Sequence, residues 1–517
     1  MTRVSTARTI AVGSVALTID DVVALARGEA RPVLDRDAVW RDRIERGSRL
    51  VADRVKRGPP IYGVTTGFGA SCETEVGPEV AATMPRNLIS YHGCGTGQMF
   101  DDFESAAIVA ARLASLARGW SGVRLAVLDG LCALLAHRIV PRIPSEGSVG
   151  ASGDLTPLSY VAAALVGERE VSLRGTIVPA GAALAAEGLS PLELAPKESL
   201  SLMNGTSAMT GLACIAERRA TRLARFAAAL TAMAVDVLRG QPGQFDERVF
   251  LAKPHPGQTA CARWIRDDLE CGPRPSTLAG RIQDPYSIRC APHVIGVLVD
   301  LLGFARPTIE TELNGVNDNP LVDVETGDIL HGGNFYGGHI AFVTDALKIA
   351  VANVADLLDR QLVLLSSPVT NKGLPENLVA VEGPARVAHH GFKAMEISAS
   401  ALTAEALKGA IPASLFSRST EGHNQDKVSM GTMAARDCLR VLELSETVAS
   451  IHLLALCQAV DLRKRDGCHA RARALHGCVR DHVPMNTGDR RQDGDIARVL
   501  ALYRAGELPI GQPAIAC

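Results

Sequence analysis

Three long stretches of the chain place apolar residues at the spacing of an amphipathic helix. Between Leu223 and Leu238, apolar side chains recur three and four residues apart and fall on one helix face. From Val343 to Leu364, steps of four and three alternate and form a heptad seam suited to antiparallel bundle packing. A third apolar run covers Val428 to Val460. We therefore expect the chain from Ser207 onward to be dominantly helical.

The N-terminal part has shorter elements. Residues 20–57 and 103–137 carry short helical patterns, and Glu170 to Val178 has the pattern of a β-hairpin that turns at a glycine. The whole pattern predicts a mainly α fold, with a smaller N-terminal α+β part, residues 1–203. A long antiparallel helical bundle, residues 204–517, follows it.

Composition supports helix packing and excludes several functions. Hydrophobic residues make up 47% of the chain but aromatic residues only 4%, so Ala, Leu and Val must fill the interior. The net charge of −2 is spread along the chain, and neither a basic patch for nucleic acid nor an acidic tail is present.

The cysteines and the N-terminus favour a cytoplasmic protein. The 12 cysteines are scattered, with no C-x-x-C pair and no His-x-x-x-His partner for a zinc site. The N-terminus lacks the regions of a signal peptide, and we find no uninterrupted apolar run of about 18 residues. We expect free thiols and no membrane partner.

A Gly-rich stretch from Gly147 to Pro157 carries unusual local chemistry. Its sequence is Gly-Ser-Val-Gly-Ala-Ser-Gly-Asp-Leu-Thr-Pro. Because glycine lacks a Cβ, such a loop can bring backbone atoms into contacts that are closed to other residues. A plain interpretation also fits: a turn into a helix, with Asp154 or Thr156 as N-cap and Pro157 at the first helical position.

The chemical interpretation centres on the tripeptide Ala151-Ser152-Gly153. In a tight bend, the amide nitrogen of Gly153 can bond to the carbonyl carbon of Ala151 with loss of water, which closes a five-membered ring. Loss of the Ser152 hydroxyl as a second water leaves an exocyclic methylidene. The product is 4-methylidene-imidazol-5-one (MIO), an electrophile. A serine hydrolase is disfavoured because the G-x-S-x-G pattern is lacking.

Further polar loops contain motifs that helix packing does not explain. They are Ile61–Gly69, Leu202–Thr206, Gln283–Cys290, Asn317–Pro320, His331–Phe335 and Asn424–Met430. Each has a plain alternative, such as an Ω-like loop around Tyr62, a surface ion pair of Arg289, or a helix cap at Asp426. The glycines near residue 95 lack the G-x-x-x-x-G-K-[ST] pattern, so we expect no nucleotide site.

In their order along the chain, these motifs resemble those of the aromatic amino acid ammonia-lyase family, which contains histidine, phenylalanine and tyrosine ammonia-lyases and related aminomutases. Shared patterns are G-A-S-G-D-L around Ser152, Y-G-V-T-T-G-F-G from Tyr62 and Q-D-x-Y-S-x-R-C from Gln283. The resemblance implies an ammonia-lyase/fumarase-like fold, an MIO formed autocatalytically from the tripeptide, and no metal or nucleotide. It also implies a homotetramer whose active sites combine loops from several subunits.

The resemblance also implies roles for matching residues. Tyr62 would take the β-proton, Arg289 would hold the substrate carboxylate with two parallel hydrogen bonds, and Asn204 and Tyr286 would orient the amine and the electrophile. We expect positive neighbours and helix N-termini to lower the pKa of Tyr62 from about 10 to about 7 or 8. The catalytic residues are then Tyr62, Ala151, Ser152, Gly153 and Tyr286, and the substrate-binding residues are Gly69, Tyr91, His92, Asn204, Gln283, Arg289, Phe335, Asn424 and Gln425.

Three positions bear on the substrate. Tyr91 and His92 match the family pair that contacts the substrate side chain, although Tyr91 departs from the usual Ser, His or Phe. Histidine lyases resemble the chain at His92 but have a glutamate where this chain has Gln425. His92 with a neutral glutamine is similar to the pattern of several bacterial tyrosine ammonia-lyases, whose site pattern is the most similar, and of tyrosine aminomutases. In these enzymes the His can hydrogen-bond a phenol. Against a bare phenyl ring, the unpaired His92 would cost about 1 to 3 kcal/mol.

We therefore expect an aromatic L-amino acid ammonia-lyase, a carbon–nitrogen lyase that converts tyrosine to the trans-arylacrylate 4-coumarate. Histidine and phenylalanine are the next candidate substrates, and a tyrosine 2,3-aminomutase would use the same residues. A non-catalytic helical scaffold is an alternative of another class, but it gives no reason for Tyr62, Asn204 and Arg289.

Overall fold

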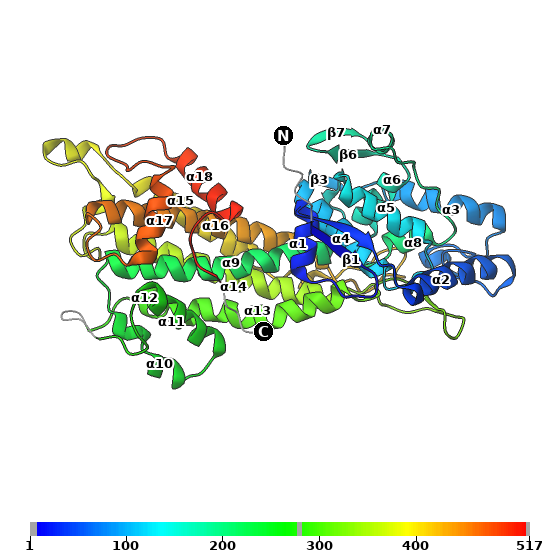
Figure 1. Ribbon diagram of the computed structural model, residues 1–517, viewed down its shortest axis with the longest axis horizontal. Coiled ribbons are helices and arrows are strands. Elements are labelled where there is room, and N and C mark those ends of the chain that lie inside the picture. The colour runs from blue at the N-terminus through cyan, green and yellow to red at the C-terminus, as the bar shows by residue number, and fades with distance from the viewer. Residues whose placement is uncertain (1–7, 277–281, 513–517) are drawn as a thin grey trace. The chain divides into compact units, whose positions relative to one another are not determined.

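The computed structural model describes residues 8–276 and 282–512 (Figure 1). Helices make up 58% of it and strands 8%, which confirms the expected mainly α class. Two compact units are present: unit 1 comprises residues 1–218, 306–345 and 412–436, and unit 2 comprises residues 219–305, 346–411 and 437–517. This division differs from the single boundary expected near residue 203, because the breaks after residues 218, 305, 345 and 436 fall inside long helices.

The helices of unit 1 are mostly short. In α4 (Asp102–Leu116), the Asp101 side chain accepts from the Glu104 N–H and the Glu104 side chain accepts from the Asp101 N–H, so this capping box satisfies two free donors. Every residue from Ser105 to Leu116 is buried, the pattern of a helix enclosed on all sides. The others are α1 (Ile19–Arg27), α2 (Ala38–Arg57), η1 (Gly69–Ser71), α3 (Pro78–Tyr91), α5 (Leu125–Ala136), α6 (Leu155–Leu165), α7 (Ala180–Ala186), α8 (Glu198–Met203) and η5 (Ala413–Phe416).

All strands lie in small sheets of unit 1. β1 (Arg8–Val12) pairs in parallel with β2 (Ala30–Leu34), and β3 (Thr96–Met99) pairs antiparallel with β5 (Pro144–Glu146). A three-stranded sheet has the order β4 (Ile139–Pro141), β6 (Glu170–Leu173), β7 (Thr176–Pro179), and β8 (Leu321–Asp323) pairs with β9 (Asp328–Leu330). The hairpin expected from Glu170 to Val178 is confirmed, and Arg174 and Gly175 at its turn both have positive φ.

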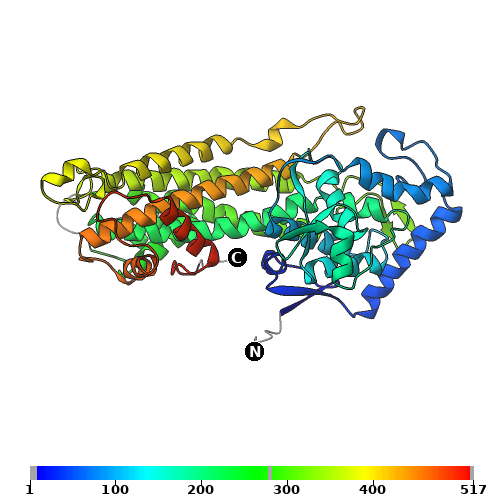
Figure 2. The ribbon, with the colours of Figure 1, turned by 90° about the horizontal axis from the view of Figure 1, so that it is seen from above.

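In the described residues of unit 2 every regular element is a helix, and its long helices run along one another in both views (Figures 1 and 2). The apolar face expected from Leu223 to Leu238 is buried, and so is the expected seam from Val343 as far as Gln361, while Leu364 at its end is half-buried. The helices that lie in unit 2 or enter it are α9 (Ser207–Val237), η2 (Pro242–Phe245), α10 (Glu247–Leu251), α11 (Pro256–Asp268), α12 (Tyr286–Arg289), α13 (Ala291–Leu313), α14 (Gly338–Ser366), η3 (Glu376–Leu378), η4 (Pro384–Ala388), α15 (Lys393–Gly409), α16 (Gly431–Leu462), α17 (Ala470–Arg480) and α18 (Asp493–Ala505).

One segment of the described residues, Tyr286–Leu313, is long and apolar enough by length and composition to cross a membrane. Half of its most apolar window is buried within the protein. Since the core helix of a soluble protein passes the same test, this is weak evidence for a membrane span.

An ion pair is fully enclosed in unit 1. Lys197 Nζ lies 2.9 Å from Asp318 Oδ2, and neither side chain has exposed surface. Nζ also donates to the Ser121 carbonyl oxygen at 3.0 Å and to the Ser201 hydroxyl at 2.8 Å, so each of its three protons has an acceptor. The pair ties the start of α8 to the loop that precedes β8.

We expect Lys197→Met to lower the free energy of unfolding by about 3 to 5 kcal/mol, because the Asp318 carboxylate would stay buried without its counter-charge. The matched control is Arg174→Ala, which removes an ion pair to Glu187 whose arginine side chain is 69% exposed. That change should cost less than about 1 kcal/mol. Urea unfolding at neutral pH, followed by circular dichroism, compares the two. A loss for Lys197→Met no larger than for the control would contradict this expectation.

Candidate active site

Loops of unit 1 enclose a cavity of about 510 Å³, within the range of small-molecule sites. Its walls come from segments that are distant in the sequence, between Pro60 and Val428. Of the residues singled out from the sequence, those that line it are Tyr62, Gly69, Ala151, Ser152, Asn204, Phe335, Asn424 and Gln425.

The tripeptide lies in a tight left-handed turn. φ is +50° at Ser152 and +75° at Gly153, and for a non-glycine residue this region costs of order 1 kcal/mol. The Gly205 N–H donates to the Ser152 carbonyl oxygen at 3.2 Å, and the Asp154 N–H donates to the Gly205 carbonyl oxygen at 2.7 Å. A Cβ at Gly153 would lie 2.1 Å from that Gly205 oxygen, so only glycine fits here.

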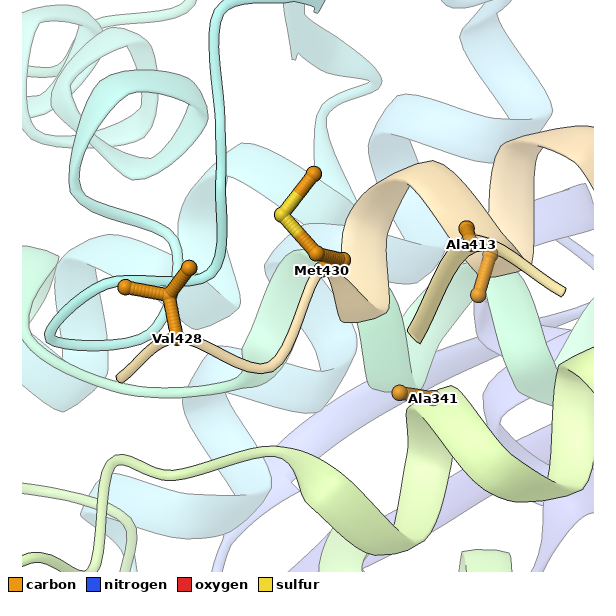
Figure 3. Close-up of a cluster of buried hydrophobic side chains, with 5 residues drawn as sticks. Ala341, Ala413, Val428 and Met430 are labelled. Carbon is orange, nitrogen blue, oxygen red and sulfur yellow. The ribbon is translucent and has the colours of Figure 1, made fainter. Parts of the chain in front are cut away.

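A second segment, residues 428–430, holds the preceding residues. The Met430 N–H donates to the Val149 carbonyl oxygen at 3.0 Å, and a Cβ at Gly150 would lie 2.3 Å from Ser429 Oγ. Ala151 and Val149 pack against a buried apolar cluster that includes this segment. Figure 3 shows the cluster, whose buried members are Ala341, Ala413, Val428, Met430 and Ala434.

The Tyr62 hydroxyl oxygen accepts a hydrogen bond from the Gly69 N–H at 2.8 Å. Burial raises the pKa of Tyr62 above its ordinary value, the Gly69 bond partly offsets this, and the Glu421 carboxylate raises it further. Groups in the described part of this chain therefore do not supply the lowering of the pKa of Tyr62 that the proposed base needs. Within the described residues, the charged side chain that acts on this phenol is the negative Glu421, whereas positive neighbours were expected.

Glu421 joins the Tyr62 loop to the loop that carries Asn424. Its Oε1 accepts from the Ala70 N–H at 2.9 Å and its Oε2 accepts from Asn424 Nδ2 at 2.9 Å. A Cβ at Gly69 would lie 1.7 Å from Glu421 Oε1, so the glycine is needed for this approach. Sequence reasoning missed Glu421, whose available signal was its place three residues before Asn424.

Two amide side chains face the tripeptide. Gln425 Nε2 donates to the Ser152 hydroxyl at 3.2 Å, while its Oε1 accepts from the Thr420 hydroxyl at 2.9 Å, which orients the amide. Asn204 is 2% exposed, and its Oδ1 has no hydrogen-bond partner within the described part of the chain. An unpaired buried acceptor in a cavity wall indicates a position for a donor on a bound molecule.

Tyr91 and His92 lie at the end of α3 and are not among the cavity-lining residues. Their ring centroids are 4.5 Å apart. Burial, with a smaller effect from Arg169, lowers the pKa of His92 to about 4, so the imidazole is neutral at neutral pH. Burial also raises the pKa of Tyr91 to about 12, with smaller contributions from Tyr62 and Glu421, so this phenol lies near the Tyr62 loop.

Gln283, Tyr286 and Arg289 belong to unit 2 and do not line this cavity. Tyr286 is 71% exposed, and the Arg289 guanidinium lies 4.5 Å from the centroid of its ring. The structure thus gathers eight of the predicted site residues around one cavity, while Tyr91, His92 and Gly153 of unit 1 and the three residues of unit 2 do not line it.

Comparison with known proteins decides the family. The family description "Aromatic amino acid lyase" matches residues 17–481. The chain belongs to this family. The histidine ammonia-lyase of Bradyrhizobium diazoefficiens is 36% identical over 496 residues, which cover 95% of this chain and 94% of that protein. The histidine ammonia-lyase of Koribacter versatilis is 38% identical over 507 residues, 95% and 97% of the two chains. The protein is therefore a carbon–nitrogen lyase, and the scaffold alternative is excluded.

Solved structures of aromatic amino acid lyases and aminomutases share its fold. Tyrosine aminomutase from Streptomyces globisporus has a TM-score of 0.89 at 35% identity and covers 97% of each chain. Phenylalanine aminomutase from Pantoea agglomerans has a TM-score of 0.89 at 30% identity, with 98% and 100% coverage. Histidine ammonia-lyase from Trypanosoma cruzi has a TM-score of 0.88 at 31% identity, with 97% and 94% coverage. The expected ammonia-lyase fold is confirmed.

In this aromatic amino acid lyase, the Asp154 side chain does not cap the helix that follows it. It is the N-cap residue of α6, but its side chain makes no capping bond there. Its carboxylate instead accepts from the Met209 N–H at 2.9 Å and from the hydroxyls of Thr432 and Ser148. Burial raises the pKa of Asp154 to about 6 although these donors lower it.

Other lining residues also escaped sequence reasoning. They are Pro60, Thr66, Cys72, Gly150, Asn319, His331, Gly332, Tyr336, Asp426, Lys427 and Val428. Several of them lie inside motifs quoted from the sequence, but nothing local to a motif shows which of its side chains face a cavity. Within residues 8–276 and 282–512, no group of three or more His, Cys, Asp or Glu side chains could hold a metal ion.

The raised pKa of Asp154 predicts a pH dependence of stability. The folded-state pKa of about 6 lies above the ordinary 3.8, so the folded protein binds this proton more tightly than the unfolded chain does. The stability that Asp154 contributes is complete below about pH 4 and falls as the pH rises to about 6. Asp154→Asn cannot ionise and should remove this fall. Urea unfolding from pH 4 to 7 measures the free energy of unfolding of both proteins. The wild-type value minus the variant value should fall as the pH rises; a pH-independent difference would rule this out.

Proposed function

We propose that this enzyme eliminates ammonia from L-tyrosine to give 4-coumarate, using MIO formed from Ala151-Ser152-Gly153. The observation that carries the substrate assignment is the Gln425 amide on the Ser152 hydroxyl at 3.2 Å. A carboxylate at this position would suit an imidazole substrate, whereas the neutral amide does not attract a positive ring. His92, which is neutral at neutral pH, supplies a hydrogen-bonding group suited to a phenol.

The residues around the tripeptide fit this prosthetic group. The left-handed turn and the glycine at position 153 allow the close approach that ring closure requires. The unpaired Oδ1 of Asn204 is available to a donor on the bound amine. Once formed, MIO supplies an electrophilic methylidene that takes up the amino group and makes it a better leaving group.

Tyr62 is the proposed base for the β-proton, and its hydroxyl already accepts one hydrogen bond from Gly69. Because burial and Glu421 raise its pKa, positive charge must come from outside unit 1 of the same chain. We assign this charge to Arg289 of a second copy, with Tyr286 and Gln283 beside it, in a homotetramer. The 71% exposure of Tyr286 supports this, since a surface tyrosine can enter a neighbour's site.

The relatives supply two further candidates. Histidine is the alternative substrate, because the relatives named above at 36% and 38% identity are histidine ammonia-lyases. A 2,3-aminomutase is the alternative reaction, because the first of the solved structures named above is a tyrosine aminomutase. Phenylalanine ranks below both, since a phenyl ring leaves His92 unpaired. We propose a cytoplasmic location, in keeping with the scattered cysteines.

Product analysis tests the proposal. Purified protein incubated separately with tyrosine, phenylalanine and histidine should form 4-coumarate from tyrosine fastest, without β-tyrosine. Ser152→Ala should lose at least about 10³-fold of this activity because it removes the electrophile. Ser48→Ala, whose hydroxyl bonds only within α2, is the matched control and should keep it. Faster release of ammonia from histidine, or β-tyrosine as the main product, would overturn the assignment in favour of that alternative.

A substitution at His92 tests the specificity argument. His92→Phe should raise the ratio of kcat/KM for phenylalanine over tyrosine by about 10- to 100-fold, because the phenol loses its partner and the phenyl ring gains an apolar one. Gln425→Glu is the companion variant and should favour histidine instead. Steady-state kinetics on all three substrates measure both effects. An unchanged ratio for His92→Phe would show that this imidazole does not face the substrate ring.

A further inference from the structure

The tripeptide is backed by two layers. The first is the Asn204–Thr206 turn, whose Gly205 makes hydrogen bonds on both sides of Gly153, to Ser152 and from Asp154. The second layer is the guanidinium of Arg112. A Cβ at Gly205 would lie 2.1 Å from Arg112 Nη1 and 2.2 Å from the Asn317 carbonyl oxygen. Gly205 is therefore enclosed between the tripeptide and a buried cation.

Arg112 comes from α4 and is fully buried. One guanidinium nitrogen donates to the Ser201 carbonyl oxygen. The other donates to Ser207 Oγ at 3.3 Å, to the Asn317 carbonyl oxygen at 3.3 Å and to Asn317 Oδ1 at 3.2 Å. One rigid planar group thus fastens the chain before and after Gly205 and ties it to the loop ahead of β8.

The charge of Arg112 is expensive to bury. Burial lowers the pKa of Arg112 to about 10, while Asp318 and Asp154 act in the opposite direction. The side chain is therefore still charged at neutral pH, and it is held by carbonyl and hydroxyl oxygens in a core made largely of Ala, Leu and Val. An apolar side chain would leave the buried oxygens of Ser201, Ser207 and Asn317 without this donor, so the guanidinium fixes the positions of these three residues.

We propose that Arg112 is a positioning residue for cyclisation of the tripeptide, an inference that rests on the proposed MIO chemistry. Its guanidinium holds the turn from Ser201 to Ser207 so that Gly205 keeps Ser152 and Gly153 in the left-handed conformation. In this conformation, ring closure requires little further movement of the backbone.

The Gly205 N–H would also have a second role, in the chemistry of ring closure. The amide nitrogen of Gly153 bonds to the carbonyl carbon of Ala151, and the carbonyl oxygen leaves as water with the N–H protons of Gly153 and Ser152. A second water takes the Ser152 hydroxyl and its Cα proton, so no oxidant is needed. Loss of the Gly153 N–H proton and of the Cα proton places negative charge on the Ser152 carbonyl oxygen, which is the atom that accepts from Gly205 N–H.

Arg112→Lys and Arg112→Gln test the proposal, with Arg225→Lys as the matched control. Arg225 is also a buried arginine, but it pairs with Asp268 in unit 2 at 2.8 Å. The measurements are the mass of the peptide containing residues 151–153 from folded protein, its rate of change after synthesis, and the thermal unfolding midpoint. We expect the Arg112 variants to slow the loss of two waters by about tenfold or more. Arg225→Lys should lose stability but cyclise as the wild type does.

Three outcomes would overturn the proposal: cyclisation of folded Arg112→Gln at the wild-type rate, an equal delay in Arg225→Lys, or a delay that simply follows the unfolding midpoint in all variants. If neither Arg112 variant folds, Ser207→Ala removes one acceptor of the guanidinium and should still slow cyclisation; an unchanged rate would then count against Arg112. Failure of the proposed function looks different, because the wild-type peptide itself would keep both waters.

Discussion

Unit 1 is organised around the backbone contact between two glycines, Gly153 and Gly205. A Cβ on Gly153 would lie 2.1 Å from the Gly205 carbonyl oxygen, and a Cβ on Gly205 would lie 2.1 Å from Arg112 Nη1. This contact brings α4, α8 and the loop ahead of β8 together behind the tripeptide, and it determines where buried polar groups must go. Arg112 and Lys197 are enclosed there as donors to buried carbonyl oxygens, and Asp318 is the counter-charge of Lys197.

The groups around the cavity meet one requirement of the proposed chemistry, holding the substrate, but not another, stabilising a phenolate. Groups of unit 1 hold the tripeptide, and the cavity wall presents amides and a phenol whose pKa is raised. These groups are suited to holding neutral and hydrogen-bonding parts of a substrate, but not to stabilising a phenolate. A base that depends on charge from another copy would be inactive in an isolated chain, which couples activity to assembly.

Sequence reasoning succeeded where the signal was local. The periodicity from Leu223 to Leu238 and the hairpin at Arg174-Gly175 are properties of neighbouring residues, and both are confirmed. The motifs identified the family because each is a short contiguous string. Glu421 and Arg112 were missed because their partners are distant in the chain: Ala70 is 351 residues from Glu421, and Asn317 is 205 residues from Arg112. The negative charge near Tyr62 was not foreseen for the same reason, because Glu421 is distant from Tyr62 in the chain.

The discontinuity of unit 1 also sets an order of events during synthesis. Gln425 lies 273 residues after Ser152, and Met430, whose N–H donates to the Val149 carbonyl oxygen, follows it. At roughly 5 to 20 residues per second, a ribosome adds these residues about 15 to 55 s later. In the proposed chemistry, the emerging polypeptide keeps an ordinary serine during that interval, because the groups that hold the tripeptide are not yet in place. Late closure of unit 1 would then shield cellular amines and thiols from an unprotected electrophile.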